Sequence, residues 1–401
     1  MIVTDIETIR LDAFPNILWV LVKTDQDIVG LGETFYGTQA AEGHIHQTIA
    51  PYLIGKDPRN IERHQAHLTG YLGFAGSGAE VRGRSAVDIA LWDILGKSVG
   101  LPLCDLLGGR VRDSVKAYNT CAGYSYVQTR PTQGTANFGL DAKRGQYEDL
   151  QGFLTRADAV AESLLEMGIT AMKIWPFDYA AEKSGGQFIS SEDLKKGLEP
   201  FEKIRKAVGD RMDIMAELHS MWNRPMATRI ARELEQFKPL WVEDPVMMDH
   251  MDSIGEVARS TRSPIAVGET RGLMADYRYL LDLNALSLLI MDMSWCGGVS
   301  EARKIANLAA TYHTPVAFHD CSGPVVLTVS THLALHTQNC FVQEMVRAFY
   351  FGWYGEVVEG LPILDNGLLS VSQTPGSGVS LRPEVLARPD CRRRTTTRAD
   401  L

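Results

Sequence analysis

Short apolar runs alternate with longer amphipathic stretches along most of this chain, from about residue 115 onward. These runs predict strands at 115–121, 170–175, 212–217, 239–243, 264–268, 287–292, 315–319 and 341–345. The stretches between them, such as 156–167, 224–237 and 299–312, have the pattern of helices. Strands and helices in this order predict a closed parallel barrel, where chemistry gathers at the carboxyl ends of the strands. A doubly wound open sheet is the alternative, and we favour the barrel because polar residues end nearly every strand.

The region before the barrel follows a different pattern. Three strands and then three helices are expected, at 2–10, 18–24, 29–35, 41–50, 60–72 and 84–98, with a longer loop around Pro15. This order is that of an α+β unit, which gives a first domain at 1–114 and a barrel domain at 115–345. Beyond the barrel, the segment 371–381 can return to the first domain as a strand or a turn. The arginine-rich tail at 392–398 has the composition of a solvated terminus.

Two segments interrupt the rhythm of the barrel, at 122–155 and 176–191, directly after its first two strands. Because both follow the carboxyl ends of strands, they are expected on the side where the chemistry gathers. We interpret them as lids or specificity loops, with disordered decoration as the alternative.

Composition and charge narrow the class of protein. With 401 residues, 45% hydrophobic and 22% charged, the chain is typical of a globular protein of more than one domain. Its net charge of −9 argues against a general nucleic-acid or anionic-membrane surface. No apolar run reaches the roughly 18 residues of a membrane span. The six cysteines form no CxxC pair, and with no secretory segment they predict reduced thiols in a cytoplasmic protein.

Glutamates end three consecutive predicted strands, namely Glu217, Glu243 and Glu269. The second and the third each follow the one before by 26 residues, which is enough for one strand, one helix and two short loops. The three carboxylates are therefore expected at the same end of neighbouring parallel strands, where they can hold a hard divalent cation. Unrelated strand-end acids, paired with arginines or helix N-termini, are the alternative, and the equal spacing disfavours it.

Polar residues also lie at the ends of the other predicted strands and just beyond Glu217 and Glu243. They are Asn119, Lys173, His219, Asp244, Asp292, His319 and Glu344. One rim of the barrel would therefore carry acids, bases and metal-ligand types together. His219 lies two residues beyond Glu217, so it shares the face of that glutamate if the strand continues.

Several motifs of this chain occur together in one known family. They are SAVDIALWD at 85–93, AE at 216–217, VEDP at 242–245, VGET at 267–270, MD at 291–292 with GG at 297–298, and FH at 318–319. On these motifs the chain resembles the enolase superfamily, in its mandelate racemase group, along essentially its whole length. The resemblance implies a (β/α)₇β TIM-like barrel with an α+β capping domain, in which residues 1–114 are completed by about 346–401. It also implies one Mg²⁺ per subunit, held by Glu217, Glu243 and Glu269.

The resemblance further implies a shared first step, in which a base removes the proton α to a substrate carboxylate and the dication stabilises the enediolate. His319 is the expected base, with Asp292 holding its tautomer, and a satisfied rim histidine is the alternative. His219 resembles the general acid of some sugar-acid dehydratases, which protonates the departing 3-hydroxyl. The neighbouring ligand is glutamate here rather than their aspartate, and a histidine that only orients Glu217 is the alternative.

The second strand departs from the pattern of a racemase in this group. Racemases often carry Lys-x-Lys there, whereas this chain has Lys173-Ile174-Trp175. Because tryptophan cannot accept a proton, a two-base racemase is disfavoured. Lys173 is expected to contact the substrate carboxylate or to neutralise charge beside the metal, with a structural ion pair as the alternative. Further expected substrate contacts, with ordinary packing as the alternative, are Trp175, Glu344, Asn119 and Tyr36.

We therefore expect a Mg²⁺-dependent dehydratase of a small-molecule carboxylate, a sugar acid of the aldonate or aldarate type. His319 would take the C2 proton, His219 would assist loss of the C3 hydroxyl, and the enol would become a 2-keto-3-deoxy acid. A cycloisomerase, lactonising enzyme or epimerase that uses the same enediolate is the enzymatic alternative. A non-catalytic descendant of the family is the alternative from another class of protein. Members of the family commonly assemble as homo-oligomers, and the same is expected here.

Overall fold

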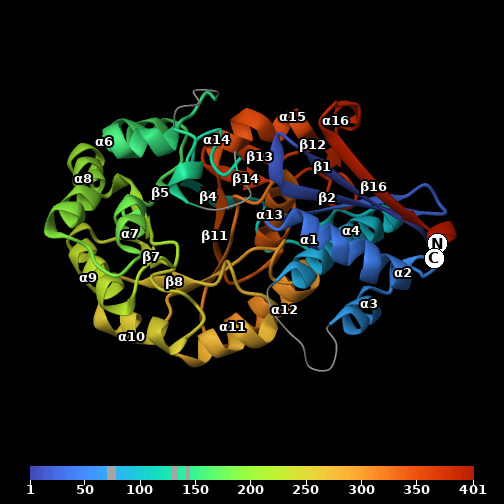
Figure 1. Cartoon of the computed structure of the whole chain (residues 1–401), viewed down its shortest axis with the longest axis horizontal. Coiled ribbons are helices and arrows are strands. Elements are labelled where there is room, and N and C mark those ends of the chain that lie inside the picture. Colours follow the sequence, from blue (N-terminus) through green and yellow to red (C-terminus); the bar gives the residue numbers. More distant parts are fainter. Residues whose placement is uncertain (70–77, 129, 131–133, 141–144) are drawn as a thin grey trace.

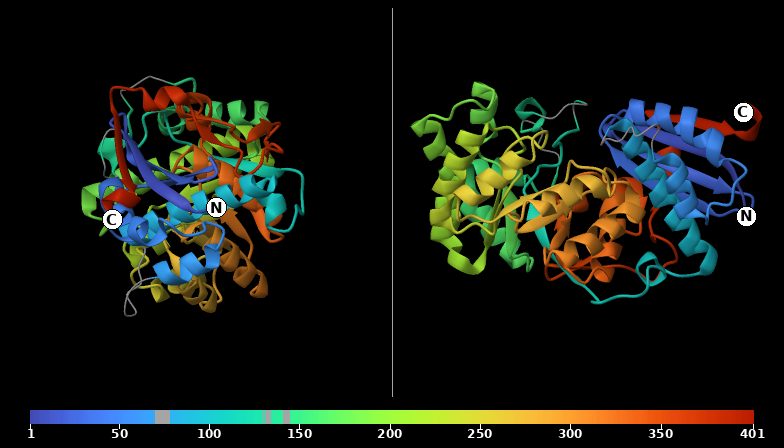
Figure 2. Two further views of the ribbon diagram at one scale, coloured as in Figure 1. Left: turned by 90° about the vertical axis from the view of Figure 1, so that its right-hand side faces the viewer. Right: turned by 90° about the horizontal axis from the view of Figure 1, so that it is seen from below.

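The computed structural model describes residues 1–69, 78–128, 130, 134–140 and 145–401. Its strands form a closed barrel and a smaller antiparallel sheet beside it (Figure 1). The smaller sheet combines the first strands of the chain with the last one, and both termini lie on its outer side (Figures 1 and 2). None of the helices in these ranges combines the length and the apolar character that a membrane crossing requires.

The strands of the barrel follow the predicted order. They are β4 (Val115–Thr120), β5 (Ala171–Ile174), β6 (Asp213–Glu217), β7 (Trp241–Glu243), β8 (Ile265–Val267), β9 (Leu288–Met291), β10 (Val316–Phe318) and β11 (Cys340–Met345). Neighbouring strands pair in parallel, and β11 pairs with β4 to close the barrel. The predicted closed barrel is therefore confirmed, and the open sheet is excluded.

Helices cover the outside of the barrel between successive strands. They are α6 (Asp149–Glu166), α8 (Ser191–Val208), α9 (Arg224–Leu234), α10 (Asp252–Ser260), α11 (Leu273–Asp282), α12 (Gly298–Thr311) and α13 (Pro324–His336). Shorter elements connect the barrel to the rest of the chain: α5 (Leu103–Leu106), α14 (Arg347–Phe349), α15 (Gly355–Val357), β12 (Val358–Glu359), β13 (Ile363–Asp365), β14 (Leu368–Ser370), β15 (Ser380–Leu381) and α16 (Pro383–Leu386).

Large and small side chains alternate inside the barrel. Trp241 and Tyr118 meet edge to face with their ring centroids 5.4 Å apart. Ala171, Ala266 and Ala317 from other strands lie in the same buried cluster. Small residues opposite bulky ones fill the interior, as expected for a barrel that is a packed core and not a pore. The chemistry is therefore confined to the rim.

The smaller sheet belongs to the capping domain. Its strand order is β16 (Cys391–Thr397), β1 (Val3–Leu11), β2 (Phe14–Thr24) and β3 (Val29–Phe35), and all its pairs are antiparallel. It is accompanied by α1 (Thr38–His44), α2 (Ala50–Leu53), α3 (Ile61–Leu68) and α4 (Ala79–Val99). The α+β capping domain built from both ends of the chain is therefore confirmed.

Strand β3 packs directly on helix α4, and two glycines make this approach possible. A Cβ atom at Gly30 would lie 2.1 Å from the carbonyl oxygen of Ala90, and one at Gly32 would lie 1.8 Å from that of Ala86. Both contacts are with backbone atoms, which cannot rotate away. The sheet and the helix therefore fit at this distance only because these positions carry no side chain.

Carboxylates of the capping domain hold the start of two barrel helices. Glu33 of β3 accepts a hydrogen bond from the backbone N–H of Val326 in α13, at 2.9 Å. Asp88 of α4 accepts from the backbone N–H of Ser300 in α12, at 2.9 Å, and from its hydroxyl at 2.7 Å. Negative side chains are favourable at helix N-termini. Because α12 follows β9 and α13 follows β10, the capping domain is attached to the half of the barrel that carries Asp292 and His319.

Three expectations outside the barrel need correction. Strand β2 begins at Phe14, so Pro15 lies within a strand and the turn from β1 is short. Most of the arginine-rich tail is not a solvated terminus, because Cys391–Thr397 forms β16 and pairs with β1. The predicted helix at 60–72 ends at Leu68, and residues 70–72 lie outside the described residues.

The two segments that interrupt the barrel rhythm carry ordered structure where they are described. The segment 176–191 contains helix α7 (Asp178–Ser184). In the segment 122–155, Tyr126 and Phe138 are buried and pack on each other with ring centroids 5.9 Å apart. The stretch 371–381 returns to the capping domain as a turn, where the Ser377 N–H donates to Asp93 of α4 at 2.8 Å. Its last two residues form β15.

Candidate active site

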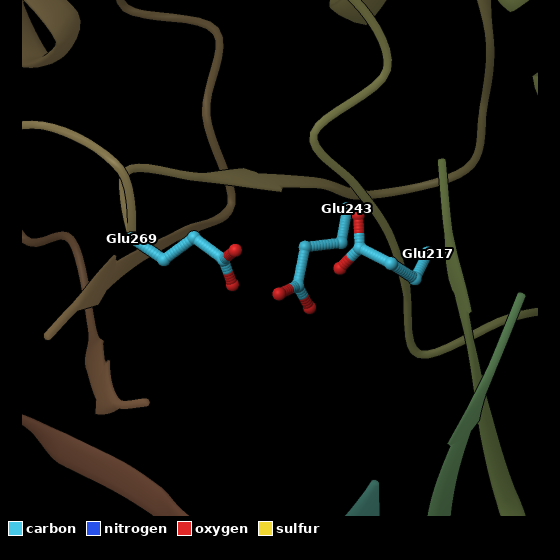
Figure 3. A group of neighbouring side chains, drawn as sticks. All are labelled: Glu217, Glu243 and Glu269. Carbon is cyan, nitrogen blue, oxygen red and sulfur yellow. The ribbon is translucent and has the colours of Figure 1, made fainter. Parts of the chain in front are cut away.

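Three carboxylates converge at the rim of the barrel (Figure 3). Glu217 ends β6, Glu243 ends β7, and Glu269 lies two residues beyond the end of β8. One oxygen of each lies within 4.8 Å of the others. Glu217 and Glu243 are also directly opposite each other in the pairing of β6 with β7. The structure therefore brings together the trio that the equal spacing predicts.

The environment of these carboxylates fits a hard divalent cation. Burial, with repulsion from Glu217 and Glu344, raises the pKa of Glu243 to about 8, although Lys173 opposes the shift. Burial is also the main cause of the raised pKa of Glu269. Carboxylates held this close repel one another unless positive charge lies between them. A donor set of three carboxylate oxygens is the chemistry that Mg²⁺ prefers.

Lys173 lies among these carboxylates. Its Nζ is 2.5 Å from an oxygen of Glu243, 3.0 Å from one of Glu344 and 3.5 Å from one of Glu217. The side chain is almost completely buried, with 3% of its surface exposed. Lys173 also lines the pocket. Its position is therefore compatible both with a structural ion pair and with the expected role beside the metal and the substrate.

His319 and Asp292 form a hydrogen-bonded pair next to this trio. His319 Nδ1 donates to Asp292 Oδ2 at 2.6 Å, and its Nε2 lies 3.4 Å from Glu269. The other oxygen of Asp292 accepts from the backbone N–H of Ser294 at 2.6 Å and from its hydroxyl at 2.5 Å. The hydroxyl of Ser322 also donates to Asp292. Both oxygens of Asp292 therefore accept hydrogen bonds. Because Asp292 is bonded to Nδ1, the other ring nitrogen of His319, Nε2, faces the three glutamates.

His219 reaches the pocket from the turn that follows β6, on the other side of the barrel from His319. Its backbone N–H donates to Glu217 at 2.7 Å, and its ring Nδ1 lies 2.7 Å from Asp178 of α7. Burial lowers the pKa of His219, but the charges of Asp178 and Glu217 outweigh this effect and raise that pKa to about 9. The strand does not continue to His219, as the alternation argument assumed, because β6 ends at Glu217 and His219 has φ +50°. A tight turn brings the ring to the pocket instead.

A pocket lies above these groups. The capping domain, the segment after β4 and the barrel rim all contribute to its wall, which consists of Phe35, Tyr36, Thr120, Tyr126, Val127, Lys173, Trp175, Glu217, His219, Glu269, Trp295, His319, Cys321 and Glu344. Tyr36 and Trp175 therefore lie where substrate contacts were expected. Trp175 is also packed against His219, with ring centroids 5.6 Å apart.

Asn119 is not brought into the pocket. Its amide donates to Asp149 of α6 at 3.0 Å and accepts from the backbone N–H of Arg347 at 2.8 Å. The side chain is fully buried on the outer side of the strand. Thr120, the next residue, lines the pocket and donates to Glu344. The prediction that Asn119 contacts the substrate is therefore wrong. Thr120 lines the pocket at this end of β4 instead.

Several residues of the site were not identified from the sequence. Trp295 lies three residues beyond Asp292, in a loop at the rim. Its short distance from a strand end could have indicated that it belongs to the site. Tyr126 and Asp178 lie in the two inserted segments, where no periodic pattern relates a residue to the barrel. Their contribution depends on how those segments fold over the rim.

Comparisons with known proteins agree with this architecture. The family described as mandelate racemase / muconate lactonizing enzyme, N-terminal domain, matches residues 13–108, and the enolase C-terminal domain-like family matches residues 156–385. A crystal structure of an enolase of the mandelate racemase subgroup from Agrobacterium tumefaciens has 47% sequence identity and a TM-score of 0.88, with 100% of each chain covered. An enolase protein from Sargasso Sea environmental sequencing has 41% identity and a TM-score of 0.88, with 99% of each chain covered.

Fold and rim together define an enzyme of the (β/α)₇β barrel class. This chain belongs to the enolase superfamily, in its mandelate racemase group. Among its relatives, the D-xylonate dehydratase of Haloferax volcanii is 31% identical over 386 residues, covering 94% of this chain and 86% of that protein. The D-galactonate dehydratase of Ralstonia nicotianae is 28% identical over 394 residues, covering 95% of this chain and 92% of that protein.

Proposed function

We propose that this chain is a Mg²⁺-dependent dehydratase of a sugar acid. The observation that carries the proposal is the pairing of two histidines, each bonded through Nδ1 to a buried carboxylate, beside a trio of glutamates. His319 with Asp292 and His219 with Asp178 supply one base and one acid within the same pocket. Dehydration needs both, since one group must take a proton and another must protonate the leaving hydroxyl. The relatives named as sugar-acid dehydratases support this reaction class.

Each residue then has a defined task. Glu217, Glu243 and Glu269 would hold Mg²⁺, which when bound supplies positive charge to the substrate carboxylate as it gains negative charge. His319 takes the C2 proton at Nε2, and Asp292 stabilises the imidazolium that forms. These steps break the C2–H bond and leave the electron pair in an enediolate.

The second half of the reaction removes the hydroxyl at C3. His219 gives a proton to the hydroxyl oxygen as the C3–O bond breaks, the electron pair of the enediolate forms a C2=C3 double bond, and water leaves. The enol then tautomerises by a net proton transfer from the C2 oxygen to C3, which gives a 2-keto-3-deoxy acid. The sum is loss of one water, with no oxidant or reductant required.

The wall of the pocket favours an aldonate, which carries one carboxylate. Of the described residues that line it, Lys173 alone is a lysine or an arginine, and it is engaged with the glutamates. The rest of the wall includes three glutamates and five aromatic residues, which are Phe35, Tyr36, Tyr126, Trp175 and Trp295. Aromatic faces and a hydroxyl suit a polyhydroxylated chain, whereas a second carboxylate would find no lysine or arginine among the described lining residues free to pair with it.

The proposal is tested by liquid chromatography with mass spectrometry, with hydrazone formation to detect a new ketone, on a panel of aldonic, aldaric and uronic acids incubated with the enzyme and Mg²⁺. We expect a product that is lighter by one water from an aldonic acid, and little or none from the matched aldaric acids. An isomer of unchanged mass would replace the dehydratase proposal with a cycloisomerase or epimerase. Turnover of aldaric acids alone would leave dehydration standing and overturn the aldonate assignment.

A further inference from the structure

We propose that Asp178 is a positioning residue for the acid step: it fixes the ring of His219 so that Nε2 faces the substrate. The inference rests on the proposed dehydratase function. It adds a specific residue of the inserted segment 176–191, which the barrel strands do not supply. Asp178 lies in the first turn of helix α7.

The geometry of the pair defines the orientation of the ring. Asp178 Oδ2 lies 2.7 Å from His219 Nδ1, and their side chains are 6% and 15% exposed. A carboxylate can only accept here, so Nδ1 carries a hydrogen and donates it. Nε2 is then the ring nitrogen left for the pocket, whose wall includes His219. The ring of Trp175, at 5.6 Å between centroids, packs beside the imidazole and limits its rotation.

The carboxylate of Asp178 is committed to this one contact. Within the described part of the chain, its other oxygen, Oδ1, is buried and has no hydrogen-bond partner. The hydrogen bond found for Asp178 among the described residues is the one between its Oδ2 and His219. A buried carboxylate with one unbonded oxygen costs stability, which a purely structural role in α7 does not explain.

The packing of α7 fixes the place of Asp178. The preceding residue, Phe177, is fully buried and stacks on Phe201 of α8 with ring centroids 6.3 Å apart. A Cβ atom at Gly197 of α8 would lie 2.2 Å from the ring of Phe177, so the helix approaches this ring as closely as glycine permits. The start of α7 is thus held against the outer layer of the barrel, and Asp178 is held with it.

The arrangement parallels that of the base. His319 is held through Nδ1 by Asp292 at 2.6 Å, and His219 is held in the same way by Asp178 at 2.7 Å. The origins of the two carboxylates differ, because Asp292 directly follows a barrel strand and Asp178 belongs to an inserted helix. Proton removal at C2 and protonation of the C3 hydroxyl therefore depend on separate supports, and one can be impaired without the other.

The test separates these two half-reactions in Asp178→Ala and Asp178→Asn. The substrate is the acid that the wild-type enzyme dehydrates best, in D₂O with Mg²⁺, and proton NMR follows exchange at C2 and formation of the 3-deoxy product. We expect kcat for dehydration to fall by about 100-fold, the lower range for loss of general acid catalysis, with KM little changed. C2 exchange should stay close to the wild-type rate. Asp178→Glu should recover part of the lost dehydration.

Three matched measurements make the outcome decisive. Lys183→Ala alters an exposed ion pair of the same helix and should leave dehydration unchanged. Mg²⁺ affinity by calorimetry should be the same in wild type and in the Asp178 variants. His219→Gln should show the same loss of dehydration with retained exchange.

Two results would overturn the inference: dehydration at the wild-type rate in Asp178→Ala and Asp178→Asn, or equal losses of exchange and dehydration with weakened Mg²⁺ binding. The second would assign Asp178 to the stability of the rim. Failure of the proposed function looks different, since the wild-type enzyme itself would then form no product lacking water. Because Asp178→Asn is nearly isosteric, it keeps the test valid if Asp178→Ala does not fold.

Discussion

The three glutamates proposed to hold Mg²⁺ are expected to favour metal binding while lowering the stability of the metal-free protein. Glu217, Glu243 and Glu269 place three carboxylates within 4.8 Å of one another. Burial is the main cause of the raised pKa of Glu243 and of Glu269, and repulsion from neighbouring carboxylates adds to it. A site that is unfavourable without its ligand gains stability when the ligand binds. Metal affinity and stability of the metal-free protein should therefore respond in opposite directions when one carboxylate is removed.

Glu269→Gln tests this relation, because it removes a charge and keeps the shape. We expect Mg²⁺ affinity to fall by roughly 100-fold or more, at least as much as the loss of an outer partner of a metal ligand. The melting temperature without Mg²⁺ should stay the same or rise, since the repulsion is relieved. Calorimetric titration and thermal unfolding measure the two effects. Glu233→Gln, on the exposed face of α9, is the control, and an equal loss of affinity there would contradict the assignment of the trio.

His332 gives a prediction about stability and pH away from the site. It is buried in α13, with Nδ1 accepting from the N–H of Cys104 at 3.3 Å and Nε2 donating to the carbonyl of Ser377 at 3.0 Å. Burial lowers the pKa of His332 from 6.5 to about 4. Between these values the unfolded chain binds a proton that the folded one does not, so stability falls as the pH drops from 6.5 to 4.

The full contribution is about 3 kcal/mol, and about 2 kcal/mol of it is lost between pH 7 and pH 5. In His332→Gln, the difference in free energy of unfolding between these two pH values should shrink by that amount. Denaturant unfolding of both proteins at each pH measures it, and the comparison removes the effect of all other titrating groups. An unchanged pH dependence in the variant would contradict the neutral, buried state of His332.

The residues of the site differ in how far the sequence could predict them. The trio and the His319–Asp292 pair follow from strand ends, whose spacing is regular. Asn119 was assigned to the wrong face, because Tyr118 and Thr120 face inward and alternation sends the residue between them outward to α6. Asp178 could not be predicted, since its contact depends on how an inserted helix packs.

At the scale of elements, the close packing of β3 on α4 determines where the capping domain lies. Strand β3 ends at Phe35, which lines the pocket, and its Glu33 binds the start of α13. The indole N–H of Trp295 also donates to the carbonyl of Phe35 at 3.0 Å. The glycines of β3 therefore influence the pocket through the position of the whole strand.

Gly32→Ala should lower the free energy of unfolding by about 3 kcal/mol, the upper range for overpacking, because its Cβ would lie 1.8 Å from a backbone oxygen of α4. KM for the sugar acid should rise as β3 moves away from the rim. Gly43→Ala in α1 is the matched control: its Cβ meets nothing within 4 Å, and the change should stabilise by about 0.5–1 kcal/mol. Equal effects of both changes on unfolding would contradict the packing argument.

Elements were predicted well where the pattern was apolar and poorly where it was polar. The barrel strands are buried and continuous in hydrophobicity, so their positions could be read within a few residues. Strand β16 was missed because its arginines and threonines mostly face solvent on an edge. Only its pairing with β1, at the other end of the chain, makes it a strand. Pro15 indicated a loop, yet proline is tolerated near the first residue of a strand.

For the whole molecule, the last strand links the two ends of the chain. Residues 391–397 of β16 pair with residues 5–11 of β1. His46 bridges the two strands, with Nε2 2.8 Å from the hydroxyl of Thr8 and Nδ1 2.8 Å from that of Thr396. The capping sheet, and through it one wall of the pocket, thus depends on a segment far from the site in sequence.

Removal of residues 391–401 should therefore weaken the capping domain more than the barrel. We expect the melting temperature to fall by about 5 °C or more, since an edge of β1 loses its partner. KM should rise because Phe35 and Tyr36 are held less firmly, while Mg²⁺ affinity, a property of the barrel rim, should be preserved. Calorimetry and steady-state kinetics test both. Loss of Mg²⁺ binding together with substrate binding would contradict the separation of the two parts.

Proton NMR of the wild-type enzyme and of His319→Asn, with an aldonic acid and Mg²⁺ in D₂O, tests the proposed reaction most directly. We expect the wild-type enzyme to remove the C2 proton signal while 3-deoxy signals grow, and His319→Asn to do neither although it binds Mg²⁺ normally. Exchange at C2 that persists in His319→Asn would contradict the role of this residue as the base. Loss of the C2 signal in the wild type without any 3-deoxy product would contradict dehydration itself.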